Sequence, residues 1–169
     1  MKRWIAIWAL TWCGAVMGQT HDTAEDRWVV TPRQRLIARV VFAEGCDEPI
    51  EGKIAIAAVI LNRLMHPAYP HELEDVIYQP MAFSSYWDDS RLWQLGGRHF
   101  QMNDRQRRAW DESMEAAQRA MLGEGDARII AFRHVRLTGG EGYFGRLMEV
   151  ATIGHHRFYG DAATATTAQ

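Results

Sequence analysis

One glutamate, Glu44, stands where its side chain could act as an acid. It continues an apolar helical stripe, at three- and four-residue spacing, that consists of Leu36, Ile37, Val40 and Val41. A carboxyl group that is partly buried against apolar neighbours keeps its proton to higher pH, as a general acid near neutrality must. The alternative is a solvated glutamate at a helix end, because glutamate is almost never fully buried. Glu44 is therefore the candidate proton donor.

Other acidic residues could assist such a donor. Glycoside hydrolysis usually needs a second carboxylate, spaced to act as a nucleophile or to activate a water. The candidates are Asp88 and Asp89, in an aromatic segment, and Glu48 and Glu51, which follow Glu44. Each of them could equally be a solvated charge in a loop or at a helix end. The sequence therefore offers no convincing partner for Glu44.

Side chains suited to binding sugar gather in residues 79–87. Sugar rings pack their apolar C–H faces on aromatic rings, while their hydroxyls need amide and hydroxyl partners. Both kinds are present here, and more lie near the C-terminus: Gln79, Phe83, Ser84, Tyr86, Trp87, Tyr143, His156 and Tyr159. The alternative is that several of these aromatic residues belong to the core.

Metal and thiol chemistry are weaker alternatives. The seven histidines include no H-E-x-x-H motif, and adjacent His155 and His156 in a strand would point to opposite faces. A zinc amidase is therefore disfavoured. Cys46 could be a nucleophile only with a histidine partner that the fold would have to supply.

Three ordered blocks of sequence resemble one known family. The blocks are VVFAEGCDEPIEGKIAIAAVILNR (residues 40–63), VIYQPMAFS (76–84) and IGHHRFYG (153–160). Together they are similar to the SleB/CwlJ family of cell-wall hydrolases, over roughly residues 32–160. The chain departs from the family pattern after Glu44, where Gly45 and Cys46 replace the usual Ala-Arg, and in the AFRHVRL segment.

The resemblance implies a fold and a reaction. Members of the family resemble lysozyme-like and resuscitation-factor-like folds and cleave peptidoglycan glycan strands as lytic transglycosylases with one catalytic glutamate, which Glu44 matches. In that reaction the substrate supplies the nucleophile, the C6 hydroxyl of the muramoyl sugar, so one residue can donate and then remove a proton. The residues that match family blocks are the preferred candidates for binding substrate, together with His156: Gln79, Phe83, Ser84 and Tyr159.

Capping residues, prolines and apolar faces predict the helices that carry these residues. Thr31 and Pro32 predict an N-cap and the first helical position of a helix over residues 32–45. A second helix, apolar on all faces and hence central, should begin at Pro49 and stop at His66-Pro67. A short helix over 72–78 and an ordered aromatic loop over 81–97 should follow. Asn103 should cap a long helix to about residue 122, whose apolar face holds Trp110, Met114, Ala117 and Met121.

The last third of the chain is rich in β-forming residues. Residues 129–137 and 150–158 read as β segments, and the glycine-rich segment 139–142 reads as a turn. The expected fold class is α+β: lysozyme-like, with a mainly helical body and a small C-terminal β-hairpin.

The ends of the chain and its net charge indicate where the protein acts and which partner is disfavoured. Residues 1–18 have the basic, apolar and small-residue regions of a signal peptide, although a releasable anchor is an alternative. Residues 19–30 should be an exposed lead-in, 31–160 the cell-wall hydrolase domain, and 161–169 a disordered tail. Without Lys2 and Arg3 the 19 basic residues become 17, against 21 acidic ones, which disfavours nucleic acid as a partner. Of the two cysteines only Cys46 lies beyond the signal segment, so no internal disulfide is expected.

These features together predict a secreted or periplasmic enzyme that touches the membrane only through its signal segment and uses no cofactor. Its expected reaction is cleavage of the MurNAc–GlcNAc β-1,4 bond of peptidoglycan with formation of a 1,6-anhydro-MurNAc end. The alternatives are a muramidase or an amidase acting on peptidoglycan, or a peptidoglycan-binding module without catalysis. The sequence indicates no oligomeric state.

Overall fold

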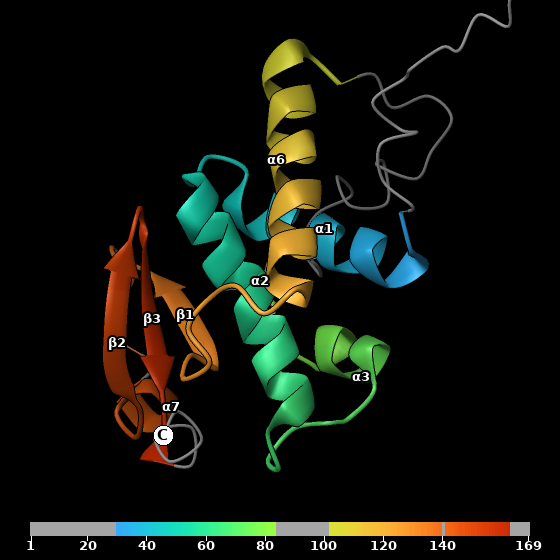
Figure 1. Cartoon of the computed structure of the whole chain (residues 1–169). Coiled ribbons are helices and arrows are strands. Elements are labelled where there is room, and N and C mark those ends of the chain that lie inside the picture. Colours follow the sequence, from blue (N-terminus) through green and yellow to red (C-terminus); the bar gives the residue numbers. More distant parts are fainter. Residues whose placement is uncertain (1–29, 84–101, 140, 163–169) are drawn as a thin grey trace, which may run out of the picture.

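A computed structural model describes residues 30–83, 102–139 and 141–162 of the chain. The elements in chain order are α1 (Pro32–Gly45), α2 (Ile50–Met65), α3 (Leu73–Tyr78), α6 (Asp104–Met121), β1 (Ala131–His134), α7 (Glu141–Phe144), β2 (Met148–Ile153) and β3 (His156–Gly160). Figure 1 shows α1, α2, α3 and α6 on one side and the strands, with the short helix α7, on the other. The predicted signal segment, the lead-in, most of the aromatic loop and nearly all of the tail lie outside the described residues.

The first helix begins and ends where its caps predict. The Thr31 side chain accepts a hydrogen bond from the Gln34 N–H at 3.1 Å, and Pro32 takes the first helical position. Gly45 ends α1 at a close approach to α2, because a Cβ there would lie 2.6 Å from Ile56 Cδ1. The chain therefore turns sharply just after Glu44.

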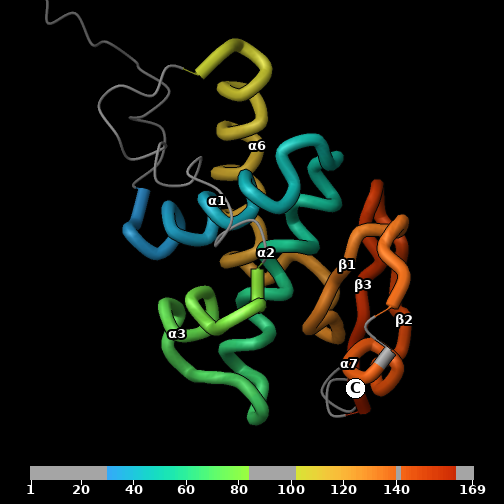
Figure 2. Tube along the Cα trace, turned by 180° about the vertical axis from the view of Figure 1, so that it is seen from behind, coloured from blue at the N-terminus to red at the C-terminus, as the bar shows by residue number. Residues whose placement is uncertain are grey.

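Helix α2 is the centre of the fold. Its residues from Gly52 to Ile60 are all buried, as predicted for a helix that is apolar all round. It packs against α1, α3, α6 and β1, and Figure 2 shows it from behind, between the other helices and the sheet. It ends at His66, whose extended backbone precedes Pro67.

Helix α6 packs on α1 and α2 through small side chains. Asn103 and Gln106 form a full capping box at its start, which confirms the predicted N-terminus. The buried residues are Ala109, Ser113, Ala116, Ala117 and Ala120. The predicted face was therefore wrong in part, because Met121 is exposed and Trp110 only half-buried. Small residues let the helix axes approach closely, and the larger side chains lie at the edge of the contact.

The strands form one antiparallel sheet in the order β1-β3-β2. The predicted single β segment over 150–158 is in fact two strands, because Gly154 (φ +55°) and His155 make a two-residue turn between Ile153 and His156. Glycine at the first central position is the requirement of a type II′ turn. The predicted turn over 139–142 also needs correction, since α7 already begins at Glu141.

Side chains of α2 tie the helical body to the sheet. Arg63 Nε donates to the Ile130 carbonyl at 2.7 Å, and Asn62 donates to the carbonyls of Asp126 and Ile129. The predicted α+β class is confirmed, with a third strand added to the expected hairpin. Within the described ranges, no helix has the length and apolar character needed to cross a membrane.

Candidate active site

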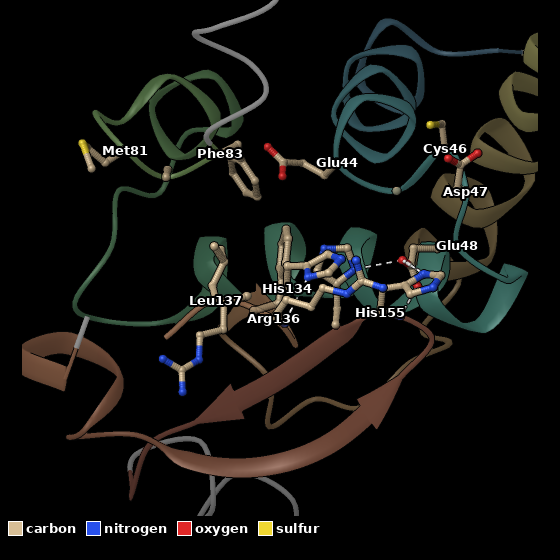
Figure 3. A pocket seen from close by; sticks show the side chains of 15 residues that line it. Glu44, Cys46, Asp47, Glu48, Met81, Phe83, His134, Arg136, Leu137 and His155 are labelled. Carbon is tan, nitrogen blue, oxygen red and sulfur yellow. Dashed lines mark hydrogen bonds and ion pairs between the residues drawn. The ribbon is translucent and has the colours of Figure 1, made fainter. Parts of the chain in front are cut away.

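A cleft of about 550 Å³ opens between the helices and the sheet. Its helical wall carries Glu44, Asp47 and Glu48, from the end of α1 and the turn into α2. Its sheet wall carries His134, Arg136, His155 and His156, and the segment after α3 adds Met81 and Phe83. Glu44 therefore lies across the cleft from His134 and Arg136, whereas Glu48 lies beside His155, as Figure 3 shows.

Glu44 lies in the last turn of α1, where the apolar stripe of that helix reaches the cleft. Its stripe neighbours Ile37, Val40 and Val41 are fully buried, while Glu44 itself is half-buried. Figure 3 shows its carboxylate projecting into the cleft toward Phe83. The structure therefore places Glu44 as predicted, with its stem against the core and its carboxyl group at the cleft.

Phe83 is buried at the edge of the cleft. The side chain is 1 % exposed, and its ring lies 5.0 Å from the Arg63 guanidinium carbon and 6.2 Å from the Phe132 ring. Little of the ring face is open to a sugar. The burial favours the core alternative for Phe83, although the residue also lines the cleft.

The turn before Phe83 holds an unusual residue at the rim. Gln79 accepts a hydrogen bond from the Ala82 N–H at 3.0 Å, and Met81 has a φ of +63° and is 91 % exposed. Proline at the second position of this turn and a positive φ at the third are the features of a type II turn, where glycine is usual at the third. Met81 thus presents a large apolar side chain to solvent from a strained backbone.

Glu48 was a candidate second carboxylate with a solvated charge as the alternative, and the solvated alternative is wrong. Its side chain is 5 % exposed, and its two oxygens meet the tip of the β2–β3 hairpin. Oε2 accepts the His155 backbone N–H at 2.9 Å, and Oε1 lies 3.0 Å from His155 Nδ1. The Glu48 carbonyl in turn accepts a hydrogen bond from Lys53 Nζ at 2.9 Å. Glu48 therefore joins the turn after α1 to the start of α2 and to the sheet.

The two adjacent histidines approach the same carboxylate. His156 Nδ1 lies 3.3 Å from the Glu48 oxygen that His155 contacts. The prediction that they point to opposite faces was wrong, because His155 lies in the turn and only His156 lies in a strand. Burial lowers the pKa of His156 below its ordinary value, and the Glu48 carboxylate opposes part of that shift. His156 is therefore a buried, neutral side chain near neutral pH.

Two other candidate residues for substrate binding, Tyr159 and Gln79, fall outside this arrangement. Tyr159 follows the core residue Phe158 in β3 and so lies on the other face of the sheet, where its hydroxyl accepts from Arg133 Nε at 2.9 Å. Gln79 caps the end of α3 and is not part of the described cleft lining. Ser84 lies outside the described residues, as do Asp88 and Asp89.

The described residues bear on the metal, thiol and second-carboxylate alternatives. Among the described residues, no group of three or more histidine, cysteine or carboxylate side chains is arranged to hold a metal ion. Cys46 is half-buried and lines the cleft beside Glu44. Glu51, a candidate second carboxylate, is exposed in the first turn of α2.

Sequence reasoning missed the cluster formed by Glu48, His155 and His156. The sequence contains part of the pattern that could have revealed this cluster, namely a glycine followed by two histidines within a run of β-forming residues. Reading Gly154 as a turn would have divided the run and moved His155 out of the strand. No local pattern shows that Glu48, 107 residues earlier, meets this turn.

Solved structures share this fold. The catalytic domain of the SleB protein of Bacillus cereus superposes with a TM-score of 0.59 at 25% sequence identity, covering 75% of this chain and 88% of that one. The catalytic domain of the germination-specific lytic transglycosylase SleB from Bacillus anthracis gives a TM-score of 0.58 at 23% identity, covering 78% of this chain and 97% of that one.

Sequence comparison shows the family. The Cell Wall Hydrolase profile matches residues 47–159, which is more than half of the chain. The chain therefore belongs to the SleB/CwlJ family of cell-wall hydrolases. The matched region begins three residues after Glu44.

Curated relatives are longer than this chain. The spore cortex-lytic enzyme of Bacillus subtilis (strain 168) is 42% identical over 89 residues, which cover 48% of this chain and 27% of that protein. The enzyme of the same name from Oceanobacillus iheyensis is 37% identical over 89 residues, with 48% and 30% covered. The chain thus spans less than a third of the length of the curated relatives it matches.

Proposed function

We propose that this protein degrades peptidoglycan by cleaving the MurNAc–GlcNAc β-1,4 bond, as a lytic transglycosylase with Glu44 as its single acid and base. The observation that carries the proposal is the half-buried carboxyl group of Glu44, held at the end of a buried helix and directed into an open cleft. The family membership and the names of the curated relatives support a cell-wall substrate.

The position of Glu44 suits a proton donor. The last turn of α1 is the negative end of the helix dipole, which favours the uncharged carboxyl group over the carboxylate. Apolar neighbours act in the same direction. Glu44 protonates the glycosidic oxygen as the bond from C1 of the muramoyl sugar breaks. The resulting carboxylate then takes the proton of the C6 hydroxyl while that oxygen bonds to C1, which closes the 1,6-anhydro ring.

The cleft suits a glycan. A volume of about 550 Å³ lies in the range of binding sites for small ligands or a few sugar units. The helical wall supplies the acid, and the sheet wall supplies hydrogen-bonding groups. Peptidoglycan lies outside the cytoplasm, and the signal-like segment over residues 1–18 agrees with export to the cell envelope.

The test is the substitution Glu44→Gln. Glutamine keeps the volume of the side chain but cannot donate a proton, so we expect release of soluble fragments from sacculi to fall by about 10²- to 10⁴-fold with an unchanged melting temperature. Glu51→Gln, an exposed carboxylate in α2, is the matched control and should retain the activity. A Glu44→Gln enzyme that digests sacculi within about threefold of wild type would remove Glu44 as the acid.

The product identifies the reaction. Intramolecular attack gives an anhydro-muramoyl end, lighter by one water than the hydrolysis product, and mass spectrometry of the fragments separates the two. Reducing-end MurNAc as the sole new terminus would reassign the protein to the muramidases. Cleavage only between muramic acid and the stem peptide would reassign it to the amidases.

A further inference from the structure

We propose that His155 is a glycan-binding residue, and that Glu48 is the positioning residue that makes its cleft-facing nitrogen a hydrogen-bond acceptor. The inference rests on the proposed function, because it concerns how the same cleft holds a peptidoglycan strand. The ligand groups it assigns are donors on the sugars, namely hydroxyls and acetamido N–H groups.

The contacts of His155 divide its ring into a fixed side and an open side. Nδ1 lies 3.0 Å from Oε1 of Glu48, and the His155 backbone N–H donates to the other oxygen at 2.9 Å. The Glu48 side chain is 5 % exposed, whereas that of His155 is 58 % exposed. The ring is thus attached to a buried carboxylate through one nitrogen, and its remaining edge is available at the cleft that it lines.

The carboxylate determines where the ring proton lies. An ionised carboxylate only accepts hydrogen bonds, so the Nδ1 that faces it must carry hydrogen. In the neutral ring Nε2 then holds the lone pair. This relation between a carboxylate and an imidazole also orients histidines in metal sites. Here it gives the sheet wall a hydrogen-bond acceptor, which fits the hydroxyl and amide donors that every sugar of the strand carries.

Two further features restrain the ring. The His134 ring stacks on His155 at a centroid distance of 5.9 Å with the planes 4° apart. Gly154 has no space for a side chain, because a Cβ there would lie within 2 Å of Glu48 Oε2. The backbone of the turn therefore sits directly on the carboxylate, and the side chain that follows is held in one place before substrate arrives.

The first experiment measures glycan binding in a variant that is expected not to cleave the glycan. In a Glu44→Gln background, isothermal titration with a peptidoglycan tetrasaccharide should show about fivefold weaker binding for His155→Ala, the effect of one hydrogen bond. His155→Gln should retain more of the affinity, because its amide oxygen can accept in place of Nε2. His71→Gln, which changes an exposed histidine of the loop between α2 and α3, is the matched control and should bind as the parent does.

The second experiment reads the proton position directly. The ¹⁵N shifts of the His155 ring should show a protonated Nδ1 and an unprotonated Nε2. In Glu48→Gln the side-chain amide can donate to Nδ1, so the ring proton should move to Nε2 and the tetrasaccharide affinity should fall. A purely structural role for Glu48 would change the melting temperature and leave the ring tautomer unaltered in the folded protein.

The outcomes separate this inference from the proposed function. Unchanged binding by His155→Ala, or a protonated Nε2 in the parent, would overturn the inference while leaving Glu44 as the acid. A parent that binds no tetrasaccharide would overturn the glycan assignment of the cleft together with the inference. If Glu48→Gln does not fold, His155→Ala still decides, because its side chain is largely exposed.

Discussion

Two glutamates four residues apart have different environments, which suit them to different proposed roles. Glu44 keeps its carboxyl group at the cleft, half-buried against apolar side chains. Glu48 is buried and accepts a backbone N–H from the β2–β3 turn at 2.9 Å. A carboxylate with such partners is held in one position, whereas a general acid must exchange its proton during each turnover. The two residues are of the same type, and their different environments are what suit them to different proposed roles.

Substitution of Phe83 tests whether this residue belongs to the core or to a sugar-binding surface of the cleft. Because its ring is 1 % exposed, we expect Phe83→Ala to cost about 3 to 5 kcal/mol of stability and to lower the melting temperature strongly. Activity per folded molecule should change much less. Met81→Ala, which truncates a 91 % exposed side chain of the same segment, is the control and should leave the melting temperature nearly unchanged. A Phe83→Ala protein that melts normally but no longer digests sacculi would instead make the ring a sugar-binding surface.

His156 should make stability depend on pH. Burial lowers its pKa in the folded protein, so the unfolded chain binds a proton at this residue that the folded chain does not. Stability therefore falls as pH drops through about 6.5, the ordinary histidine value. We expect the melting temperature of wild type to decrease more between about pH 7.5 and pH 5.5 than that of His156→Gln.

The exposed His71 supplies the control for that measurement. His71→Gln should keep the pH dependence of wild type, because this side chain is exposed outside the cleft. Equal pH dependence in wild type, His156→Gln and His71→Gln would show that His156 is not the source.

At the residue scale, the position of Glu44 could be predicted from the sequence but its surroundings could not. Glu44 could be placed because the apolar stripe that positions it is local, with a helical period. Glu48 could not, because its burial depends on a turn 107 residues away. Tyr159 shows the same limit. Side chains alternate between the two faces of β3, and only the packing of the sheet decides which face meets the cleft.

At the scale of elements, the helices were predictable and the sheet was less so. Thr31, Asn103 and Pro67 mark helix ends through hydrogen bonds or steric effects within a few residues, and those ends agree with the structure. The turn at Gly154 was missed because it is only two residues long and is flanked by β-forming residues on both sides. The short helix α7 was missed because a glycine-rich stretch favours a turn on composition alone.

The β2–β3 turn should tolerate no side chain at Gly154. A Cβ there would overlap Glu48 Oε2, so Gly154→Ala must displace the turn or the carboxylate, at a typical cost of about 1 to 3 kcal/mol. We expect a lower melting temperature and slower digestion of sacculi, because the sheet wall moves. Gly123→Ala is the matched control: its φ is also positive, at +93°, and a Cβ there has no neighbour within 4 Å. Equal effects of the two substitutions would show that backbone strain alone is responsible and that Glu48 does not fix the turn.

At the scale of the whole molecule, the cleft is a product of the connections between the helical body and the sheet. Glu48 fixes the hairpin tip, and Arg63 and Asn62 of α2 bind the backbone that leads into β1. Within the helical body, Lys53 of α2 pairs with Glu112 of α6. Each connection joins residues more than 50 positions apart in the sequence. The two walls are thus held at a fixed separation by contacts that no local pattern encodes.

We expect the domain to extend beyond the boundary predicted from the sequence, because of a contact of the same kind. The sequence placed it at residue 160, but Asp161 Oδ2 lies 3.1 Å from Nε2 of the buried His66, at the end of α2. We expect a fragment of residues 30–162 to fold and to digest sacculi like the chain of 169 residues. A fragment of residues 30–160 should melt a few degrees lower, because it loses this contact between Asp161 and His66. Circular dichroism melting and turbidity loss of sacculi compare the two fragments. Equal melting temperatures would return the boundary to residue 160, and an inactive but folded longer fragment would show that residues beyond this range take part in the reaction.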